Sequence, residues 1–254
     1  MTHRRGAKRR VEKQYAKVAT EGLPDDLGGS DPAHRLRRMG YSDQEIAGVP
    51  ESSLVGLGCG NPTALVGLKE GETVLDIGSG AGLDAFLAAR RVGPKGKVIG
   101  VDMTAEMVER ARRAAQEAGY QNVEFRRGEM ESLPLDDESV DVIISNCVMN
   151  HAPDKVAAFR ETWRVLRPTG RIHVADLVTK GRLPPAGTPG LEVWAEWLAV
   201  AAGKQEYLEA IRKAGFREIA VVEEGPFDSP AMKGPLLGKI ISVRVTAYKQ
   251  GAVS

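Results

Sequence analysis

The stretch LDIGSGAG combines glycines and an acid at a spacing that could bind a small ligand. Gly78, Gly80 and Gly82 follow a short apolar run, and glycines let a ligand approach the backbone N–H groups that open the next helix. Their G-x-G-x-G spacing differs from the G-x-G-x-x-G of dinucleotide-binding turns. Asp76 would repel a pyrophosphate and attract the ammonium group of an amino-acid ligand. The turn, with Ser79 in it, therefore favours S-adenosylmethionine over NAD.

Polar side chains also follow the next three apolar runs, at the points where strands are expected to end. Asp102 and Met103 lie in GVDM, Glu129 and Met130 in GEMESLP, and Asn146 in SNCVMNHAPD. Ligands of open α/β sheets bind beyond the carboxyl ends of the strands. We expect Asp102 to accept from both ribose hydroxyls, Glu129 to meet the adenine amino group and Met130 to pack on the ring. One such acid is usually only a polar strand end, but three in succession indicate a binding site.

Two thiols stand in unusual surroundings. Cys59 lies in VGLGCGNPTAL, where glycine, asparagine and proline alone would suffice to shape a turn. Cys147 follows Asn146, and both should face the reactive end of the cofactor. A buried cysteine is ordinarily a small hydrophobe, but polar residues surround this one. His151, four residues on, is either a polar loop residue or a group that lowers the pKa of the thiol or acts as a base.

These residues require a scaffold of alternating strands and helices. Apolar runs and helical spacing predict strands at 73–77, 97–101, 122–125, 140–145, 170–178, 217–224 and 239–249, and helices at 82–92, 104–119, 154–166, 191–202 and 204–215. Thr104 is expected to cap one helix, and Ser42 with Glu45 forms a capping box ahead of a short helix that Pro50 ends. Such alternation implies right-handed crossovers and a mostly parallel sheet. We therefore predict an α/β, Rossmann-like fold with seven strands and helices on both faces.

The chain divides into three expected regions. Residues 1–70 form a basic arm and a helical cap that carries the cysteine loop, 71–180 the cofactor-binding core, and 181–254 helices and final strands that complete the sheet. The first twenty residues are expected to be a solvated arm with a short helix over 11–19. A nucleic-acid patch is the alternative, but no aromatic residues are interleaved there. The segment 181–200 should lie over the ligand side.

The amino-acid composition limits the kinds of molecule that the protein is expected to bind. The 254 residues are 42% hydrophobic with a formal charge of +1, which gives no general reason to bind nucleic acid or a membrane. No apolar run reaches 18 residues and no secretory signal opens the chain, so we expect a cytoplasmic protein with free thiols acting on a small molecule. The four histidines show no metal-binding spacing, and we expect no bound metal cofactor. The oligomeric state stays undetermined.

The motifs resemble a known family. LDIGSGAG, GVDM, GEMESLP and RVLRPTGR are similar to class I S-adenosylmethionine-dependent methyltransferases over about residues 70–180. MGYSDQEIAGVP, LGCGNPTAL and SNCVMNHAPDK further resemble the arsenite methyltransferases. With VEKQYAKVA and KQEYLEAIRKAGF, this narrower resemblance covers most of the chain.

The resemblance implies that Cys59 and Cys147 bind trivalent arsenic. Thiolates are the ligands that such a soft ion prefers. The family's third arsenic cysteine lies ten residues before a tyrosine that corresponds to Tyr207, and Trp197 stands there in this chain. Two thiolates suffice for methylarsonous acid, or for arsenite with a third thiol from glutathione or thioredoxin. An indole facing the site would favour a bulkier, more apolar substrate.

Three functions follow from these patterns. The first is methyl transfer to trivalent arsenic held by the two thiolates. The second is methylation of an organic oxygen, nitrogen or carbon atom, in which the two cysteines take no part in catalysis and His151 or Asp176 acts as the base. The third is a sensor that binds without turnover, which would call for an output module such as a helix-turn-helix that the sequence does not display.

Overall fold

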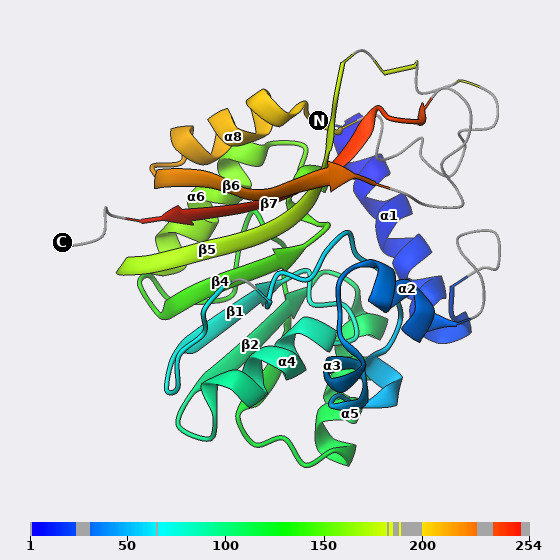
Figure 1. Ribbon diagram of the computed structural model, residues 1–254, viewed down its shortest axis with the longest axis vertical. Coiled ribbons are helices and arrows are strands. Elements are labelled where there is room, and N and C mark those ends of the chain that lie inside the picture. The colour runs from blue at the N-terminus through cyan, green and yellow to red at the C-terminus, as the bar shows by residue number, and fades with distance from the viewer. Residues whose placement is uncertain are drawn as a thin grey trace.

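A single seven-stranded sheet organises the protein, for which a computed structural model describes residues 2–23, 31–64, 66–181, 183–184, 188, 200–227 and 236–249. The strand order is β3-β2-β1-β4-β5-β7-β6, and Figure 1 shows the part of it from β2 to β6. The strands are β1 Thr73–Ile77, β2 Lys97–Asp102, β3 Val123–Arg127, β4 Val140–Asn146, β5 Leu166–Thr179, β6 Arg217–Pro226 and β7 Ile240–Tyr248. Strands β1 to β5 pair in parallel, and β7 runs antiparallel to both β5 and β6. The predicted fold class is confirmed.

Helices cover both faces of the sheet. They are α1 Thr2–Glu21, α2 Pro32–Arg38, α3 Asp43–Ala47, α4 Leu83–Val92, α5 Ala105–Glu117, α6 Lys155–Val165 and α8 Lys204–Lys213, with 3-10 turns η2 Glu51–Ser53 and η3 Met149–His151. One apolar cluster joins the sheet to α4 and α5, and another joins it to α6 and α8. None of the helices in the described ranges is long and apolar enough to span a membrane.

The central strand β1 shows why the sequence gives two covered faces. Val74 points into the cluster with α4 and α5, whereas Leu75 and Ile77 belong to the cluster with α6 and α8. All three side chains are at most 1% exposed. Burying each is worth about 1.5–3 kcal/mol relative to exposure, so β1 is anchored from both sides. Its carboxyl end is therefore a rigid base for a site.

The strand order reverses beside β1. The chain passes from β1 outward to β2 and β3, then returns to β4 on the other side of β1. Connections that leave the sheet in opposite directions open a crevice at such a switch point, where ligands of α/β sheets bind. The glycine turn follows β1, and the Asn146–Cys147 segment ends β4, so both flank this crevice.

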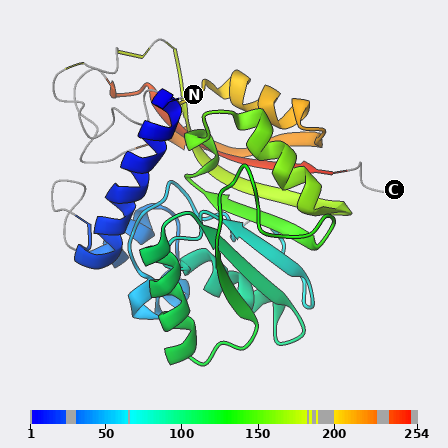
Figure 2. The same cartoon turned by 180° about the vertical axis from the view of Figure 1, so that it is seen from behind.

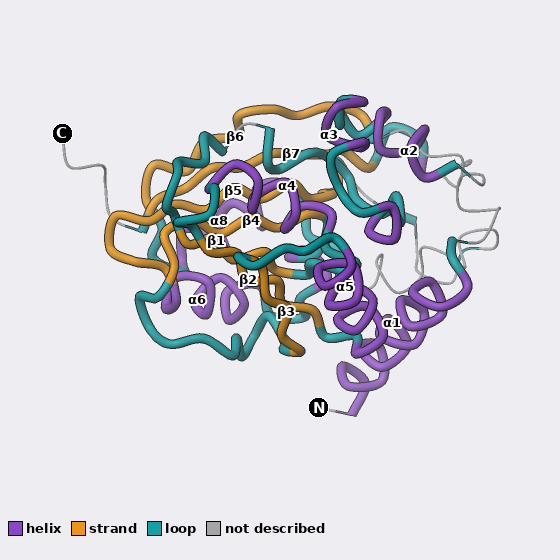
Figure 3. The backbone as a smooth tube through the Cα atoms, turned by 90° about the horizontal axis from the view of Figure 1, so that it is seen from below, coloured by secondary structure: helices purple, strands orange, loops and turns teal. Residues whose placement is uncertain are grey.

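The N-terminal segment differs from the prediction of a solvated arm. Helix α1 runs over Thr2–Glu21, about twice the predicted extent, and packs beside α5 (Figures 2 and 3). Val18 is 5% exposed in a cluster with Ala81 and Met107, while Lys13 and Lys17 face solvent. Lys13 and Lys17 thus lie on the outer face of a docked helix. The prediction was wrong because the narrow apolar stripe of α1 is buried only against a partner surface that includes α5, and the local sequence does not reveal that surface.

Some local predictions are confirmed and others are modified. Ser42 and Glu45 form the capping box, with Glu45 N–H donating to Ser42 Oγ at 3.2 Å. Thr104 occupies the N-cap position of α5, but its side chain makes no capping bond, and its buried hydroxyl has no hydrogen-bond partner among the described residues. Strand β5 begins at Leu166, four residues before its predicted start. The predicted helix over 191–202 lies almost wholly outside the described residues.

Candidate functional site

The glycine turn after β1 is held by backbone and carboxylate hydrogen bonds. Gly78 N–H donates to Val101 O at 2.7 Å, and Gly80 N–H donates to Asp102 Oδ2 at 2.9 Å. Gly78 has φ +72°, and a Cβ there would lie 2.3 Å from Val148. The turn can therefore accept no side chain at Gly78, and its backbone lies against the loop that carries Cys147.

A cavity of about 230 Å³ opens beyond this turn. Nine of the ten residues predicted to bind the cofactor line it: Asp76, Gly78, Ser79, Gly80, Asp102, Met103, Glu129, Met130 and Asn146. The tenth, Gly82, is not among the lining residues. It instead caps α4 with φ +95°, and a Cβ there would meet Phe125 at 2.7 Å. Gly82 thus permits close packing of helix and strand.

The polar groups of the cavity suit S-adenosylmethionine. Asp76 Oδ2 and the hydroxyls of Ser79 and Thr104 are buried, and in the described structure they have no hydrogen-bond partner. Burial raises the pKa of Asp76 well above its usual range, and the carboxyls of Asp84 and Asp102 raise it further. An ammonium group would relieve this repulsion and pair with Asp76. The residues present therefore fit the cofactor that the glycine spacing predicts.

The two thiols lie together beside this cavity, which Cys147 lines and Cys59 does not. One Sγ of Cys59, one Sγ of Cys147 and one carboxylate oxygen of Asp176 all lie within 4.8 Å of one another. Both cysteines are free thiols. Burial raises the pKa of Cys59 well above its usual value, and the neighbouring Cys147 and Asp176 raise it further. Cys59 is consequently a protonated thiol at neutral pH.

Backbone geometry sets Cys147 at this place. It has φ +62°, a conformation that a side-chain-bearing residue adopts infrequently, and its N–H donates to Ala175 O at 2.7 Å. Asn146 pairs with Ala175 in the parallel ladder of β4 and β5, so Asp176 follows directly at the same edge. Positive φ at a cysteine that lines a cavity is typical of a functional position.

Asn146 anchors the loop of Cys59. Its Oδ1 accepts from the Cys59 N–H at 3.0 Å, and its Nδ2 donates to Gly60 O at 2.7 Å. The same amide nitrogen lies 3.0 Å from the Tyr41 hydroxyl and 3.1 Å from Asp84 Oδ2. The sequence predicts that Asn146 faces the cofactor, and the residue does line the cavity. Its carboxamide, however, forms hydrogen bonds that position the Cys59 loop.

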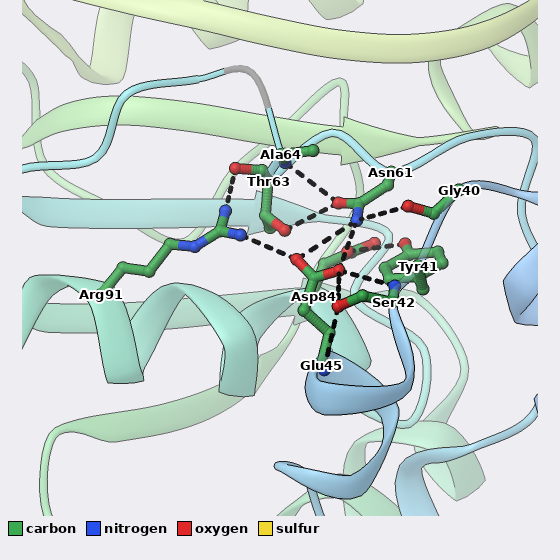
Figure 4. Close-up of polar contacts among 9 residues, drawn as sticks. All are labelled: Gly40, Tyr41, Ser42, Glu45, Asn61, Thr63, Ala64, Asp84 and Arg91. Carbon is green, nitrogen blue, oxygen red and sulfur yellow. Dashed lines mark hydrogen bonds and ion pairs between the residues drawn. The ribbon is translucent and has the colours of Figure 1, made fainter.

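A second group of contacts ties the far end of this loop to α3 and α4 (Figure 4). Asn61 Oδ1 accepts from Thr63 Oγ1 at 2.8 Å, and Asn61 Nδ2 lies 3.3 Å from Glu45 Oε2. Arg91 pairs with Glu45 at 2.7 Å and also donates to Thr63 O. The loop is therefore fixed on both sides of Cys59, which explains the asparagine in the motif GCGNP.

Tyr15 and Val11 of α1 line the cavity, which the sequence analysis missed. Burial, together with the charges of Cys147 and Asp102, raises the pKa of Tyr15 well above its usual value. One face of this basic helix carries apolar residues at helical spacing, namely Val11, Tyr15 and Val18. This stripe could have predicted from the sequence that the helix packs against the site. Helix α1 thus closes one side of the site.

His151 also lines the cavity. Burial and, to a smaller extent, the charge of Lys155 lower its pKa from 6.5 to about 4. The imidazole is therefore neutral at pH 7 and supplies no positive charge to the thiols. Trp197, which stands where the family resemblance places a third cysteine, lies outside the described residues.

Comparison with known proteins decides the family. A family model described as "Methyltransferase domain" matches residues 68–215. The arsenite methyltransferase of Halobacterium salinarum is 42% identical over 224 residues, covering 83% of this chain and 57% of that protein. The crystal structure of an arsenic(III) S-adenosylmethionine methyltransferase from Chlamydomonas reinhardtii has 32% identity and a TM-score of 0.67, covering 86% of this chain and 74% of that one. The chain belongs to the arsenite methyltransferase family.

This membership confirms the resemblance inferred from the motifs. The chain contains a methyltransferase domain over residues 68–215, and its sheet has the class I fold. Human arsenite methyltransferase is a further relative, 36% identical over 152 residues that cover 56% of this chain and 40% of that protein. The chain spans 57% and 53% of the length of the first two curated relatives.

Proposed function

We propose that this protein transfers the methyl group of S-adenosylmethionine to trivalent arsenic held by Cys59 and Cys147. The observation that carries the proposal is the approach of two sulfurs and a carboxylate oxygen within 4.8 Å of one another, at a cavity that fits the cofactor. Its relatives from Halobacterium salinarum and Chlamydomonas reinhardtii bear the names arsenite methyltransferase and arsenic(III) S-adenosylmethionine methyltransferase.

Substrate binding would exchange oxygen for sulfur on arsenic. Methylarsonous acid has two hydroxyls, and each As–O bond would be replaced by an As–S bond to one cysteine. The thiol protons leave with the hydroxyls as two molecules of water, so the exchange needs no base and no oxidant. The protonated state of Cys59 is compatible with this stoichiometry. Thiolates are the preferred ligands of so soft an ion.

The protein's contribution to the transfer would be alignment. S-adenosylmethionine, when bound, supplies an electrophilic methyl group on a sulfonium sulfur. Asp76 and Asp102 would hold its polar ends at the glycine turn, while Cys59 and Cys147 would direct the arsenic lone pair toward the cavity. Making a bimolecular step effectively unimolecular lowers the barrier by up to about 7–11 kcal/mol. No proton has to be removed from the nucleophile.

The substrate class follows from the number of thiols. The chain holds two cysteines, which match the two exchangeable positions of methylarsonous acid. Arsenite has a third position, which a small thiol such as glutathione, or thioredoxin as a thiol donor, would fill. We therefore propose methylarsonous acid or thiol-conjugated arsenite as the acceptor, in the cytoplasm.

Binding of phenylarsine oxide tests the proposal, because this arsenical bridges paired thiols. We expect one equivalent bound by the wild type and loss of tight binding in both Cys59→Ser and Cys147→Ser, read by mass spectrometry of the intact protein. Release of S-adenosylhomocysteine with methylarsonous acid would then separate an enzyme from a sensor. If both serine variants bound phenylarsine oxide as tightly as the wild type, the proposal would be wrong.

Methylation of an organic acceptor is the second candidate. Burial raises the pKa of Asp176 to about 7, a value that suits a general base near neutral pH. An activity screen with labelled cofactor against arsenite, methylarsonous acid and small organic acceptors distinguishes the two. Turnover of organic acceptors alone, unaffected by Cys59→Ser, would favour this second function.

A further inference from the structure

Asp176 is a buried carboxylate at the thiol pair. It is 1% exposed and forms no ion pair with a described residue, and the charge of Lys155 offsets its burial only in part, because its pKa is still raised to about 7. Burying a carboxylate without a counterion is unfavourable. A neutral side chain at this position of β5 would avoid this penalty. Its place within 4.8 Å of both sulfurs suggests a role in what the sulfurs bind.

Hydrogen bonds fix the orientation of this carboxylate. Oδ2 accepts from the Asn150 N–H at 2.8 Å and from the Tyr207 hydroxyl at 3.1 Å, and Oδ1 accepts from the Leu177 N–H at 2.9 Å. A carboxylate has about four acceptor positions. The donors within the described structure occupy two on Oδ2 and one on Oδ1. One acceptor position on Oδ1 is therefore left for a donor that the substrate brings.

We infer that Asp176 accepts a hydrogen bond from a hydroxyl retained on arsenic, and so allows inorganic arsenite to bind without a third thiol. This inference rests on the proposed function. Arsenite has three hydroxyls, and two of them leave as water when As–S bonds form to Cys59 and Cys147. The third As–OH bond stays intact, and its hydrogen points to Asp176. No bond to Asp176 forms and no electron is transferred.

The inference predicts selectivity between two arsenicals. Phenylarsine oxide, hydrated in water, has two exchangeable hydroxyls, and both are lost to the thiols. It has no hydroxyl left for Asp176. Arsenite keeps one, and a hydrogen bond to an ionised acceptor is stronger than one between neutral groups. Removing the carboxylate should therefore weaken arsenite binding and spare phenylarsine oxide.

The test measures the affinities of both arsenicals by equilibrium ultrafiltration with elemental analysis, without added thiols, above pH 8 so that Asp176 is ionised. The variant is Asp176→Asn, which keeps the size of the side chain. We expect arsenite binding to weaken about ten- to one-hundred-fold while phenylarsine oxide binding changes less than about three-fold. Equal weakening of both, or no change in either, would overturn the inference.

Three control variants keep the inference separate from the proposed function. Tyr207→Phe removes a donor to the same carboxylate but leaves the charge, so it should preserve the ratio of the two affinities. If Tyr207→Phe shifts that ratio as far as Asp176→Asn does, Asp176 acts only through the fold and the inference fails. Cys59→Ser and Cys147→Ser must lose both arsenicals. If they retain phenylarsine oxide, the proposed function itself fails and the inference with it.

Discussion

The side-chain oxygen of Asn146 accepts a hydrogen bond at 3.0 Å from the backbone N–H of Cys59, which lies 87 positions earlier in the chain. Asn146 directly precedes Cys147, so one side chain at the end of β4 links the two thiol-bearing loops. The distance between the sulfurs thus depends on this carboxamide. A loop rich in glycine would otherwise sample many conformations, and ordering it requires such contacts.

Asn146→Ala should separate the thiols. The change removes the acceptor for Cys59 N–H and leaves buried polar groups unpaired, which lowers the free energy of unfolding by about 1–3 kcal/mol. We expect binding of phenylarsine oxide to weaken about ten-fold or more, measured by titration. Ser242→Ala is the matched comparison, because within the described residues Ser242 Oγ donates to Cys59 O alone, at 2.7 Å. A smaller effect of Asn146→Ala than of Ser242→Ala would contradict the anchoring role.

The glycine turn should respond differently at two of its positions. Gly78 and Gly80 both have positive φ, but a Cβ at Gly78 would lie 2.3 Å from Val148, whereas one at Gly80 meets nothing within 4 Å. Both alanine variants incur the backbone penalty of about 1–2 kcal/mol. Gly78→Ala adds overpacking of about 1–3 kcal/mol. Urea unfolding should therefore rank Gly78→Ala as less stable than Gly80→Ala, and equal midpoints would refute the contact argument.

The sequence predicts the core of this fold well because the signals are local. The alternation in β1 and the glycine spacing after it depend only on neighbours in the chain, and the structure places that turn at the cavity. The role of α1 could not be predicted in the same way. Arginine and lysine dominate its composition, and Tyr15 is recognisable as a cavity residue only once α5 and the turn are in place.

The position of Asp176 depends on register rather than on a motif. The sequence indicates it only as a candidate base, because nothing in VADLV reveals which strand lies beside it. Pairing of Asn146 with Ala175 sets Asp176 next to Cys147, and this pairing is a tertiary property. The approach of Cys59 likewise depends on the hydrogen bonds of Asn146, which join distant parts of the chain.

Tyr15→Ala should weaken binding of S-adenosylmethionine. The ring forms part of the cavity wall on α1, and removing this large, partly buried side chain forfeits a share of the about 1.5–3 kcal/mol that full burial contributes. We expect the dissociation constant, measured by isothermal titration calorimetry, to rise about ten-fold. Tyr15→Phe should stay near the wild type because it keeps the ring. Lys17→Ala, on the exposed face of the same helix, is the control, and a matching loss there would point to general unfolding of α1.

Stability should respond to the titration of His151. Burial first, and Lys155 second, lower its pKa from 6.5 to about 4. Between these two pH values the unfolded chain binds a proton that the folded protein excludes, so this group destabilises the fold as the pH falls from 6.5 to about 4. His151→Gln removes that contribution. The free energy of unfolding of the wild type, measured relative to His151→Gln by urea titration, should therefore decline across this window and stay constant above it. If the difference stayed constant or grew as the pH fell, the histidine would not be buried in its neutral form, and a charged imidazole could then assist the thiol of Cys147.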